Sequence, residues 1–332
     1  MLVATHPAYL YHDTGRGHPE RPGRLAAVGK GIEMADLGEA IVRFEPRRAS
    51  HFELSRVHPA EYVGALERFC AAGGGNLDPD TPVVAASFEA ALRAAGSGLE
   101  AIERLQRGEG DAAFCAVRPP GHHATPTRGM GFCLFNNLAV AAATLAEAGE
   151  RVLVVDYDAH HGNGTQDAFY EDPRVLFVSL HQYPLYPGTG SLQEQGRGDG
   201  LGATVNFPPP AGATGDVYRR AVDEVVVPLA KRWQPTWVLL SAGFDGHRDD
   251  PITELGLTAG DYADLTREIM ALAPAGRRLV FLEGGYDLWA VVHSTAACLG
   301  ALAGTVVRPE PSTSGGPGGE VVDAVARLHA LR

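Results

Sequence analysis

The chain has 332 residues, of which 45% are hydrophobic and 20% charged, a balance typical of a globular protein. Its formal net charge of −12 at pH 7 argues against a nucleic-acid-binding protein, because such proteins carry clusters of Lys and Arg. No run approaches the ~18 apolar residues of a membrane span, and the first residues lack the pattern of a signal peptide. The four cysteines are widely spaced without a CxxC pair, so we expect free thiols and a cytoplasmic protein.

The first third of the chain is predicted to consist mainly of loops and helices. Prolines and glycines make residues 11–24 (YHDTGRGHPERPGR) a polar loop, and 76–82 is a second turn-rich loop. Helical patterns cover 25–37, 60–72 and 84–107. The last of these helices is expected to be interrupted near Gly96 and Gly98, because glycine disfavours a helix interior.

From residue 112 onward, short apolar runs alternate with helical patterns. The apolar runs are bounded by turn signals and predict buried strands at 112–117, 152–155, 175–180, 237–240 and 279–282. Helices are expected at 137–147, 217–233, 259–273 and 289–303. Strands that alternate with helices indicate an α/β fold, in which a parallel sheet has helices on both faces.

No internal repeat interrupts this pattern, so we expect one domain over residues 1–307. Residues 308–319 are rich in Pro, Gly and Ser and predict a flexible surface linker. A short helix should follow it, so that segment 308–332 packs on the same domain.

A polar motif follows each predicted strand. In chain order the motifs are RPPGHHA (118–124), DYDAHHGNG (156–164), HQYPLYPGTG (181–190), AGFDGHRDDP (242–251) and EGGYD (283–287). In an open α/β sheet, ligands bind outside the carboxyl ends of the strands. The sequence therefore predicts one functional rim that is built from all of these loops.

The second motif indicates a divalent-metal site. If the strand persists, Asp156, Asp158 and His160 share one face, because alternate residues of a strand point the same way. Asp158 and His160 suit zinc, and Asp245, at the end of its own strand, is the natural third ligand. The simpler alternative is a turn with solvated polar residues.

The remaining polar residues favour hydrolysis. A bound metal would lower the pKa of its water towards ~7 and polarise a carbonyl group. His122 and His123 would then handle protons, and Tyr286 would donate a hydrogen bond to the oxyanion that forms. Taken singly, a histidine pair is often only hydrogen-bonded, and a tyrosine beside glycines often only packs.

Four motifs, in their order and spacing, resemble those of the zinc-dependent histone deacetylase superfamily: RPPGHHA, DYDAHHGNGT, SAGFD and LEGGYDL. That superfamily also includes acetylpolyamine amidohydrolases and acetoin-utilisation proteins. The resemblance covers residues 10–303. It implies the arginase–deacetylase fold in a single domain, with a parallel sheet of about eight strands and helices on both faces.

The resemblance also implies roles for individual residues. One catalytic zinc would be bound by Asp158, His160 and Asp245. His123 would be the general base, and His122 an electrostatic partner held by Asp156. Asn163 stands where one branch of the family has Asp and, with HPERP near the N-terminus, makes the chain resemble class II. Tyr286 is present where some members have His, so full activity is expected.

An acyl-lysine channel is implied as well. Its walls would include Gly131, Phe132 and Tyr186, the last in a position where many members have Phe. Asp80 matches the rim carboxylate that binds the substrate backbone, with Asp78 as the alternative, and Arg24 matches an arginine beneath the metal. Structural potassium sites would use Asp156, Asp158, His160, Ser179 and Leu180, mostly through carbonyl oxygens.

We therefore expect a zinc-dependent amidohydrolase that removes acetyl or related acyl groups from lysine side chains of proteins. The alternative is a deacetylase of small acetylated amines such as acetylpolyamines. Polyamine-selective relatives carry a glutamate where this chain has Ile252, which favours lysine, although Glu254 could substitute if the loop bends. The oligomeric state and the acyl-chain length stay open.

Two other classes are disfavoured. A binuclear-manganese ureohydrolase of the arginase type would need carboxylates where Gly162 and His247 stand. A zinc scaffold that only binds acylated partners would not need intact Tyr286, His122 and His123.

Overall fold

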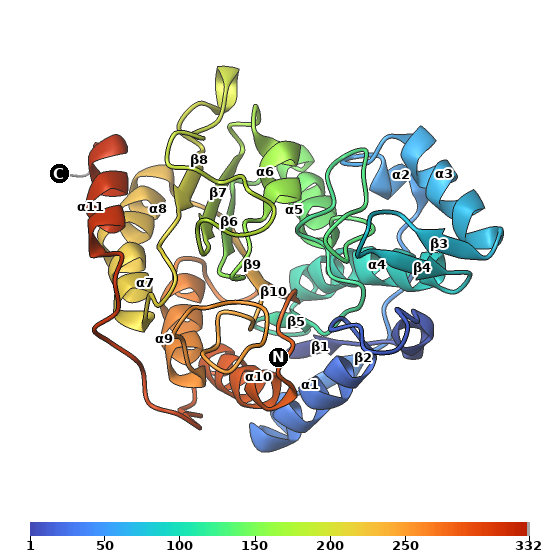
Figure 1. Ribbon diagram of the computed structural model, residues 1–332, viewed down its shortest axis with the longest axis horizontal. Helices are drawn as coiled ribbons and strands as arrows, with labels where there is room; N and C mark the ends of the chain where they lie inside the picture. Colours follow the sequence, from blue (N-terminus) through green and yellow to red (C-terminus); the bar gives the residue numbers. More distant parts are fainter. Residues whose placement is uncertain (331–332) are drawn as a thin grey trace.

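The central element of the protein is one sheet of eight strands, seen in a computed structural model that describes residues 1–330 (Figure 1). Its order is β2-β1-β5-β10-β9-β6-β7-β8, and all neighbours pair in parallel. The strands are β1 (Leu2–Ala4), β2 (Val42–Phe44), β5 (Ala113–Cys115), β6 (Val152–Asp156), β7 (Val175–Leu180), β8 (Thr204–Phe207), β9 (Trp237–Ala242) and β10 (Arg278–Leu282). The predicted α/β fold with an eight-stranded parallel sheet is confirmed.

Three strands of the sheet were not predicted: β1, β2 and β8. Each has only three or four residues, and β2 (VRF) has two exposed positions, so none forms an apolar run long enough to stand out. A separate antiparallel hairpin of β3 (Gly74–Asn76) and β4 (Pro82–Val84) encloses the loop that carries Asp78 and Asp80.

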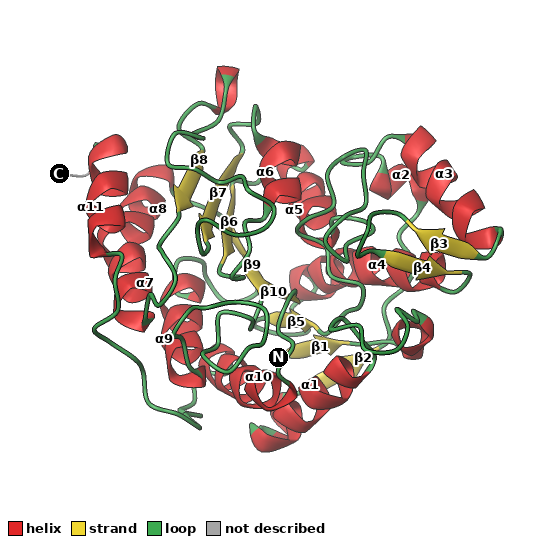
Figure 2. Cartoon of the chain, viewed as in Figure 1, coloured by secondary structure: helices red, strands yellow, loops and turns green. Residues whose placement is uncertain are grey.

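The helices cover both faces of the sheet, as Figure 2 shows in red on either side of the yellow strands. Alternate strand residues explain this arrangement: in β6, Leu153 and Val155 join one hydrophobic core, and Val152 and Val154 join the other. The first core contains residues of α1 (Gly23–Met34), α7 (Gly215–Ala221), α9 (Ala259–Met270), α10 (Leu288–Leu302) and α11 (Gly319–Leu328). The second contains residues of α4 (Ser87–Gln106) and α5 (Asn137–Glu147).

The expected interruption of α4 is wrong, because the helix continues through both of its glycines. A Cβ at Gly96 would lie 2.0 Å from the carbonyl oxygen of Arg47, and one at Gly98 would lie 2.4 Å from the ring of Phe281. The glycines therefore allow close packing of α4 against residues 47–49, which follow β2, and against β10. The stabilisation from this close packing outweighs the low helix propensity of the two glycines.

The helix expected at 217–233 is divided into α7, a π-helical segment (Val222–Val226) and α8 (Val227–Trp233). Pro228 at the start of α8 explains the change of winding, since proline has no N–H to donate and its ring crowds the carbonyl four residues earlier. The remaining helices are α2 (His51–Leu54), α3 (Ala60–Ala71) and α6 (Asn163–Phe169).

Residues 308–318 form no helix or strand, as expected for a linker, but hydrogen bonds attach them to α9. The Thr313 N–H and hydroxyl donate to the Asp261 carboxylate, and the Ser312 hydroxyl donates to Asp264 over 2.6 Å. The helix α11 then buries Val322 and Val325 in the first core. Within residues 1–330, no helix is both long and apolar enough to cross a membrane.

Candidate active site

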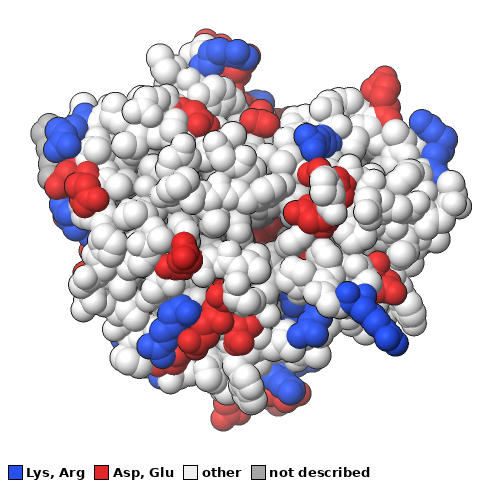
Figure 3. Space-filling model, viewed as in Figure 1, with Lys and Arg blue, Asp and Glu red and all other residues white. Residues whose placement is uncertain are grey.

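The polar motifs meet in a cavity of about 210 Å³ at the carboxyl ends of the strands. It is lined by Asp80, His123, Gly131, Phe132, His160, Leu185, Tyr186, Ile252 and Tyr286. The surface view shows a hollow near the centre of the face in view, with acidic side chains on its edge (Figure 3). Four of the five predicted motifs contribute residues to the lining, and the fifth, AGFDGHRDDP, is followed directly by the lining residue Ile252.

Three buried side chains form a candidate metal centre: Asp158, His160 and Asp245. The Nδ1 atom of His160 lies 3.2 Å from Oδ1 of Asp158 and 3.0 Å from Oδ2 of Asp245. Ligands about 2 Å from a tetrahedral zinc stand roughly 3.3 Å apart, so these spacings suit such an ion. The structure therefore brings together the three residues predicted as ligands.

Backbone groups orient the two carboxylates. The Ala159 N–H donates to Oδ1 of Asp245, and the Gly284 N–H donates to Oδ2 of Asp158, each over 2.8 Å. One oxygen of each aspartate is thereby held, and the other faces His160. Gly284 is required for this approach, because a Cβ there would lie 2.3 Å from Oδ2 of Asp245. This observation explains the first glycine of the EGGYD motif.

The centre is electrostatically suited to a cation. Burial disfavours charge on His160, but the Asp158 and Asp245 carboxylates raise its pKa to about 10. The ring therefore holds a proton between two acidic groups where a divalent ion would otherwise lie.

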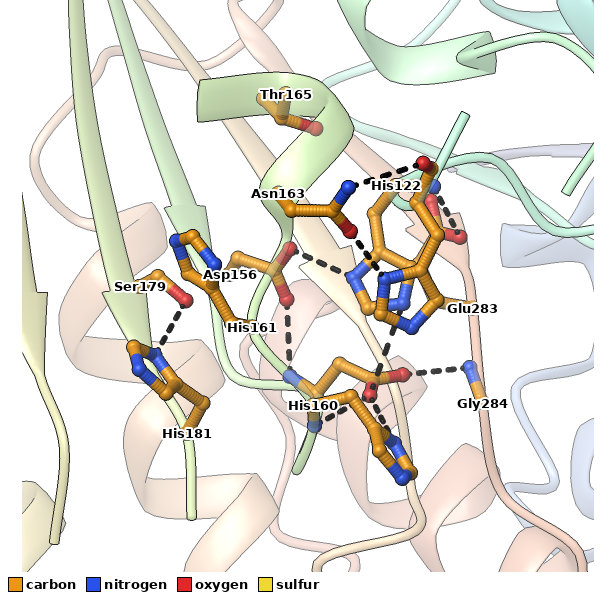
Figure 4. Close-up of polar contacts among 12 residues, drawn as sticks. His122, Asp156, His160, His161, Asn163, Thr165, Ser179, His181, Glu283 and Gly284 are labelled. Carbon is orange, nitrogen blue, oxygen red and sulfur yellow. Dashed lines mark hydrogen bonds and ion pairs between the residues drawn. The ribbon is translucent and has the colours of Figure 1, made fainter. Parts of the chain in front are cut away.

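A shared face for Asp156, Asp158 and His160 was expected only if the strand persisted, and it does not. The strand β6 ends at Asp156, so the alternation of side chains stops there. Its Oδ2 lies 3.0 Å from Nδ1 of His122, and its Oδ1 accepts from the Asp158 N–H (Figure 4). Asp156 thus contacts His122, the pairing that the family resemblance implies.

The two histidines of RPPGHHA have different partners and different pKa values. Burial disfavours charge on His122, but Asp158, Asp156 and Glu283 raise its pKa to about 10. His123 has its Nδ1 atom 2.8 Å from the side-chain oxygen of Asn163. Burial and the charges on the His122 and His160 rings lower the pKa of His123 well below its usual range. A charged ring therefore stands beside a neutral one.

Tyr286 lines the cavity, and its ring contacts two other side chains. The Arg24 guanidinium lies 5.1 Å from the ring centre, and the Phe132 ring meets it edge-on at 5.8 Å. Burial raises the pKa of Tyr286, so its hydroxyl keeps a proton to donate. Arg24 is itself buried and donates to the carbonyl oxygens of Gly285 and Glu283.

The predicted channel residues surround this centre. Phe132 has a positive φ of 69°, a backbone conformation that is rare for a bulky residue, and the Thr81 hydroxyl accepts its N–H. The Tyr186 ring meets the His123 ring edge-on at 5.1 Å. Gly131 must be glycine, because a Cβ would lie 2.5 Å from the His123 ring.

Of the two candidate rim carboxylates, only Asp80 lines the cavity. Asp78 forms an ion pair with Arg128 over 3.0 Å, which leaves it less available to a substrate. Ile252, which is 37% exposed, borders the same cavity.

Among the predicted potassium ligands, Asp156 on β6 and Ser179 on β7 pair directly in register. Asp158 and His160 lie in the loop after β6. His181 Nε2 is 3.0 Å from the Gly190 carbonyl, which only accepts, so this nitrogen carries the proton. The Ser179 hydroxyl therefore donates to His181 Nδ1 over 2.9 Å and keeps its lone pairs for a cation. Leu180 is the last residue of β7.

Sequence reasoning missed several buried groups that support the pocket. Glu283 accepts the N–H groups of Gly121 and His122 with one oxygen, at 2.6 and 3.1 Å. Arg118 and Glu20 form a buried ion pair between RPPGHHA and the first polar loop. Each was visible as a charged residue in or beside a motif, but nothing in the sequence shows which distant backbone it contacts.

Comparisons with known proteins identify the family of the chain. Residues 18–302 match the histone deacetylase domain family. A protein described as "Probable deacetylase" from Archaeoglobus fulgidus is 42% identical over 309 residues, which cover 91% of this chain and 86% of the relative. "Histone deacetylase 14, chloroplastic" from Arabidopsis thaliana is 37% identical over 91% of this chain and 77% of its own length. The solved structure of the HDA15 HD domain has a TM-score of 0.91 and 35% identity, covering 99% of this chain and 93% of that one.

Proposed function

Because the chain belongs to the histone deacetylase family and is therefore a deacetylase, we propose that it uses one zinc ion to remove acetyl groups from lysine side chains of proteins. The observation that carries the proposal is the convergence of Asp158, His160 and Asp245 in the pocket that also contains His123 and Tyr286. Two carboxylates and one imidazole, with room for water and substrate, form the ligand set of a hydrolytic zinc site.

Zinc, when bound, would polarise the acyl carbonyl and lower the pKa of the attacking water. His123 is neutral and its Nδ1 is engaged by Asn163, so Nε2 is free to take a proton from that water. The same nitrogen then returns the proton to the leaving amine. Tyr286 donates its hydroxyl hydrogen to the oxyanion that develops on the carbonyl.

His122 acts as a fixed positive charge rather than as a base in this proposal. Asp156 holds its Nδ1 at 3.0 Å, and the carboxylates of Asp158, Asp156 and Glu283 around the ring favour its charged form. A charged neighbour also favours the neutral form of His123, because two adjacent cations repel.

The pocket walls favour an acyl-lysine substrate over a polyamine. Phe132, Leu185 and Ile252 offer apolar contact to the methylene chain of lysine. The Glu254 carboxylate, which could have attracted a distal ammonium, accepts the Gln182 amide N–H over 3.5 Å. The Glu254 backbone N–H donates to the Gln182 side-chain oxygen over 2.8 Å. Among the described residues that line the pocket, Asp80 is the one acidic group outside the metal centre, and it suits a substrate backbone amide at the rim.

Structural potassium and a cytoplasmic location are further parts of the proposal. The free lone pairs of Ser179 and the in-register Asp156 support a monovalent cation between β6 and β7. All four cysteines are free and buried, which suits a reducing compartment.

A substrate screen tests the proposal. Zinc-loaded protein is assayed with acetyl-lysine peptides, peptides that carry longer acyl groups, and acetylspermidine, with Asp245→Ala protein as the inactive control. We expect the highest kcat/KM on an acyl-lysine peptide. A clear preference for acetylspermidine would favour the alternative, a deacetylase of small acetylated amines, and no turnover of any acyl amide would contradict both.

A further inference from the structure

Asp250 is a buried carboxylate that joins two loops of the pocket and has no role in the mechanism above. It lies in the loop after β9, five residues beyond Asp245, and is 6% exposed. Its Oδ2 accepts the N–H groups of Tyr286 and Asp287, at 2.7 and 3.3 Å, and its Oδ1 accepts the N–H of Ile252 at 3.1 Å. One side chain thus contacts the backbone of both the oxyanion donor and the channel wall.

The loop that carries Tyr286 needs such an anchor. It begins with Gly284 and Gly285, and Gly285 has a φ of +114°, a conformation that few other residues adopt. Arg24 holds the carbonyl side of this turn by donating to the Gly285 oxygen over 2.7 Å. Among the contacts of the described residues, the Tyr286 and Asp287 N–H groups donate to Asp250 alone. Arg24 therefore holds the carbonyl side of the turn, and the Asp250 side chain holds its N–H groups.

The position of the Tyr286 backbone matters for rate because its hydroxyl must meet the oxyanion at hydrogen-bond distance. An oxyanion donor is effective only when it is already in place as the charge develops, and a displacement of about 1 Å can cost roughly 100-fold. The Asp250 contact is made to the N–H of Tyr286 itself, so a shift there moves the side chain directly.

We infer that Asp250 is a positioning residue for deacetylation: it fixes the Tyr286 hydroxyl over the metal centre and, through the same carboxylate, fixes Ile252 in the channel wall. This inference rests on the proposed role of Tyr286. It does not require Asp250 to touch the substrate or the metal.

A double-mutant cycle tests the inference. Asp250→Ala and Asp250→Asn are made in the native protein and in Tyr286→Phe, and kcat, KM and zinc content are measured with an acetyl-lysine peptide. Asp249→Asn is the matched control, since that neighbouring carboxylate is 64% exposed and accepts no N–H of the Tyr286 loop.

We expect Asp250→Ala to lower kcat roughly 10–100-fold, as loss of an orienting contact does, with zinc content unchanged. Asp250→Asn should lose less, because its amide oxygen still accepts.

The Tyr286→Phe background decides whether Asp250 acts through Tyr286. With no hydroxyl left to misplace, Asp250→Ala should change kcat there by no more than about threefold, whereas independent effects would multiply. Equal losses in both backgrounds, or native kcat in Asp250→Ala protein, would overturn the inference. If Asp250→Ala fails to fold, the same comparison is made with Asp250→Asn.

Failure of the proposed function gives a different result. If Tyr286→Phe alone keeps native turnover, the role of Tyr286 is wrong and the positioning role falls with it. If Tyr286→Phe is impaired and Asp250→Ala is not, only the positioning role is wrong.

Discussion

The Nδ1 atom of His123 lies 2.8 Å from the side-chain oxygen of Asn163, and this contact determines which nitrogen of His123 is free to act. Asn163 is fixed in turn, because its Nδ2 donates to the His123 carbonyl over 3.4 Å and contacts the Met130 sulfur at 3.7 Å. Since the Asn163 oxygen only accepts, Nδ1 carries the proton and Nε2 keeps its lone pair. The proposed base is therefore set in the tautomer that its role requires before substrate binds.

Asn163→Ala should lower kcat roughly 10–100-fold, because the His123 ring loses the contact that fixes its tautomer and orientation. Steady-state kinetics with an acetyl-lysine peptide measure the loss, and zinc content should stay at the native level. Asn163→Asp keeps an acceptor at the same position and should retain more activity than Asn163→Ala. Native kcat in Asn163→Ala protein would show that His123 needs no such partner.

Tyr286→Phe should keep the fold and the metal but lower turnover by roughly 10²–10³, the usual cost of one oxyanion donor. Phe preserves the ring contacts with Arg24 and Phe132, so only the hydroxyl is lost. The loss should appear in kcat more than in KM, because the oxyanion exists only in the transition state. Near-native turnover would mean that Tyr286 only packs.

Ile252→Glu should shift selectivity towards acetylspermidine. A carboxylate at this partly exposed rim position would attract the distal ammonium by ~1 kcal/mol, which is about a fivefold change in the ratio of kcat/KM values. Ile252→Gln is the matched control, since it has the same shape as the glutamate without its charge. An equal shift in both variants would assign the effect to size or polarity and not to charge.

The buried ion pair of Glu20 predicts a loss of stability in acid. Burial opposes the charge on Glu20, but Arg118 and the neighbouring His12 and Arg24 lower its pKa from 4.5 to about 2. A depressed folded-state pKa stabilises the fold above pH 4.5, and this contribution disappears as the pH falls from 4.5 towards 2. The shift corresponds to about 3 kcal/mol in the free energy of unfolding.

Denaturant unfolding of chelator-treated protein at several pH values measures this effect without the linkage of metal binding. Glu20→Gln protein should be less stable at pH 6, since two arginines lose their buried partner, and its stability should fall less between pH 4.5 and 2. Parallel pH profiles for the two proteins would contradict the prediction.

The grouping of the three proposed metal ligands was predictable because its signal is local. Asp158 and His160 lie two residues apart at the end of an apolar run, and Asp245 ends another such run, so parallel topology brings them together. Resemblance to known motifs then supplied roles for the groups around them. The same logic does not place Asp156 relative to the two ligands, because β6 ends there and the side-chain alternation ends with it.

The supporting contacts were not predictable because they join distant backbone segments. Asp250 accepts N–H groups 36 and 37 residues away, and Glu283 accepts others more than 160 residues away. A buried carboxylate with backbone partners has the same sequence appearance as an exposed one. The interruption of the helix predicted at Gly96 was wrong for a related reason. The packing that Gly96 allows depends on Arg47, which is far away along the chain.

Zinc titration of the metal-free protein tests the central claim most directly. Hydrolysis of an acetyl-lysine peptide is followed as zinc is added to chelator-treated native protein and to Asp245→Ala protein. Because Asp158, His160 and Asp245 form one ligand set, turnover should rise until one zinc is bound per chain, and Asp245→Ala protein should gain neither tight zinc nor activity. Full turnover by metal-free protein, or one tight zinc in Asp245→Ala protein, would contradict the account.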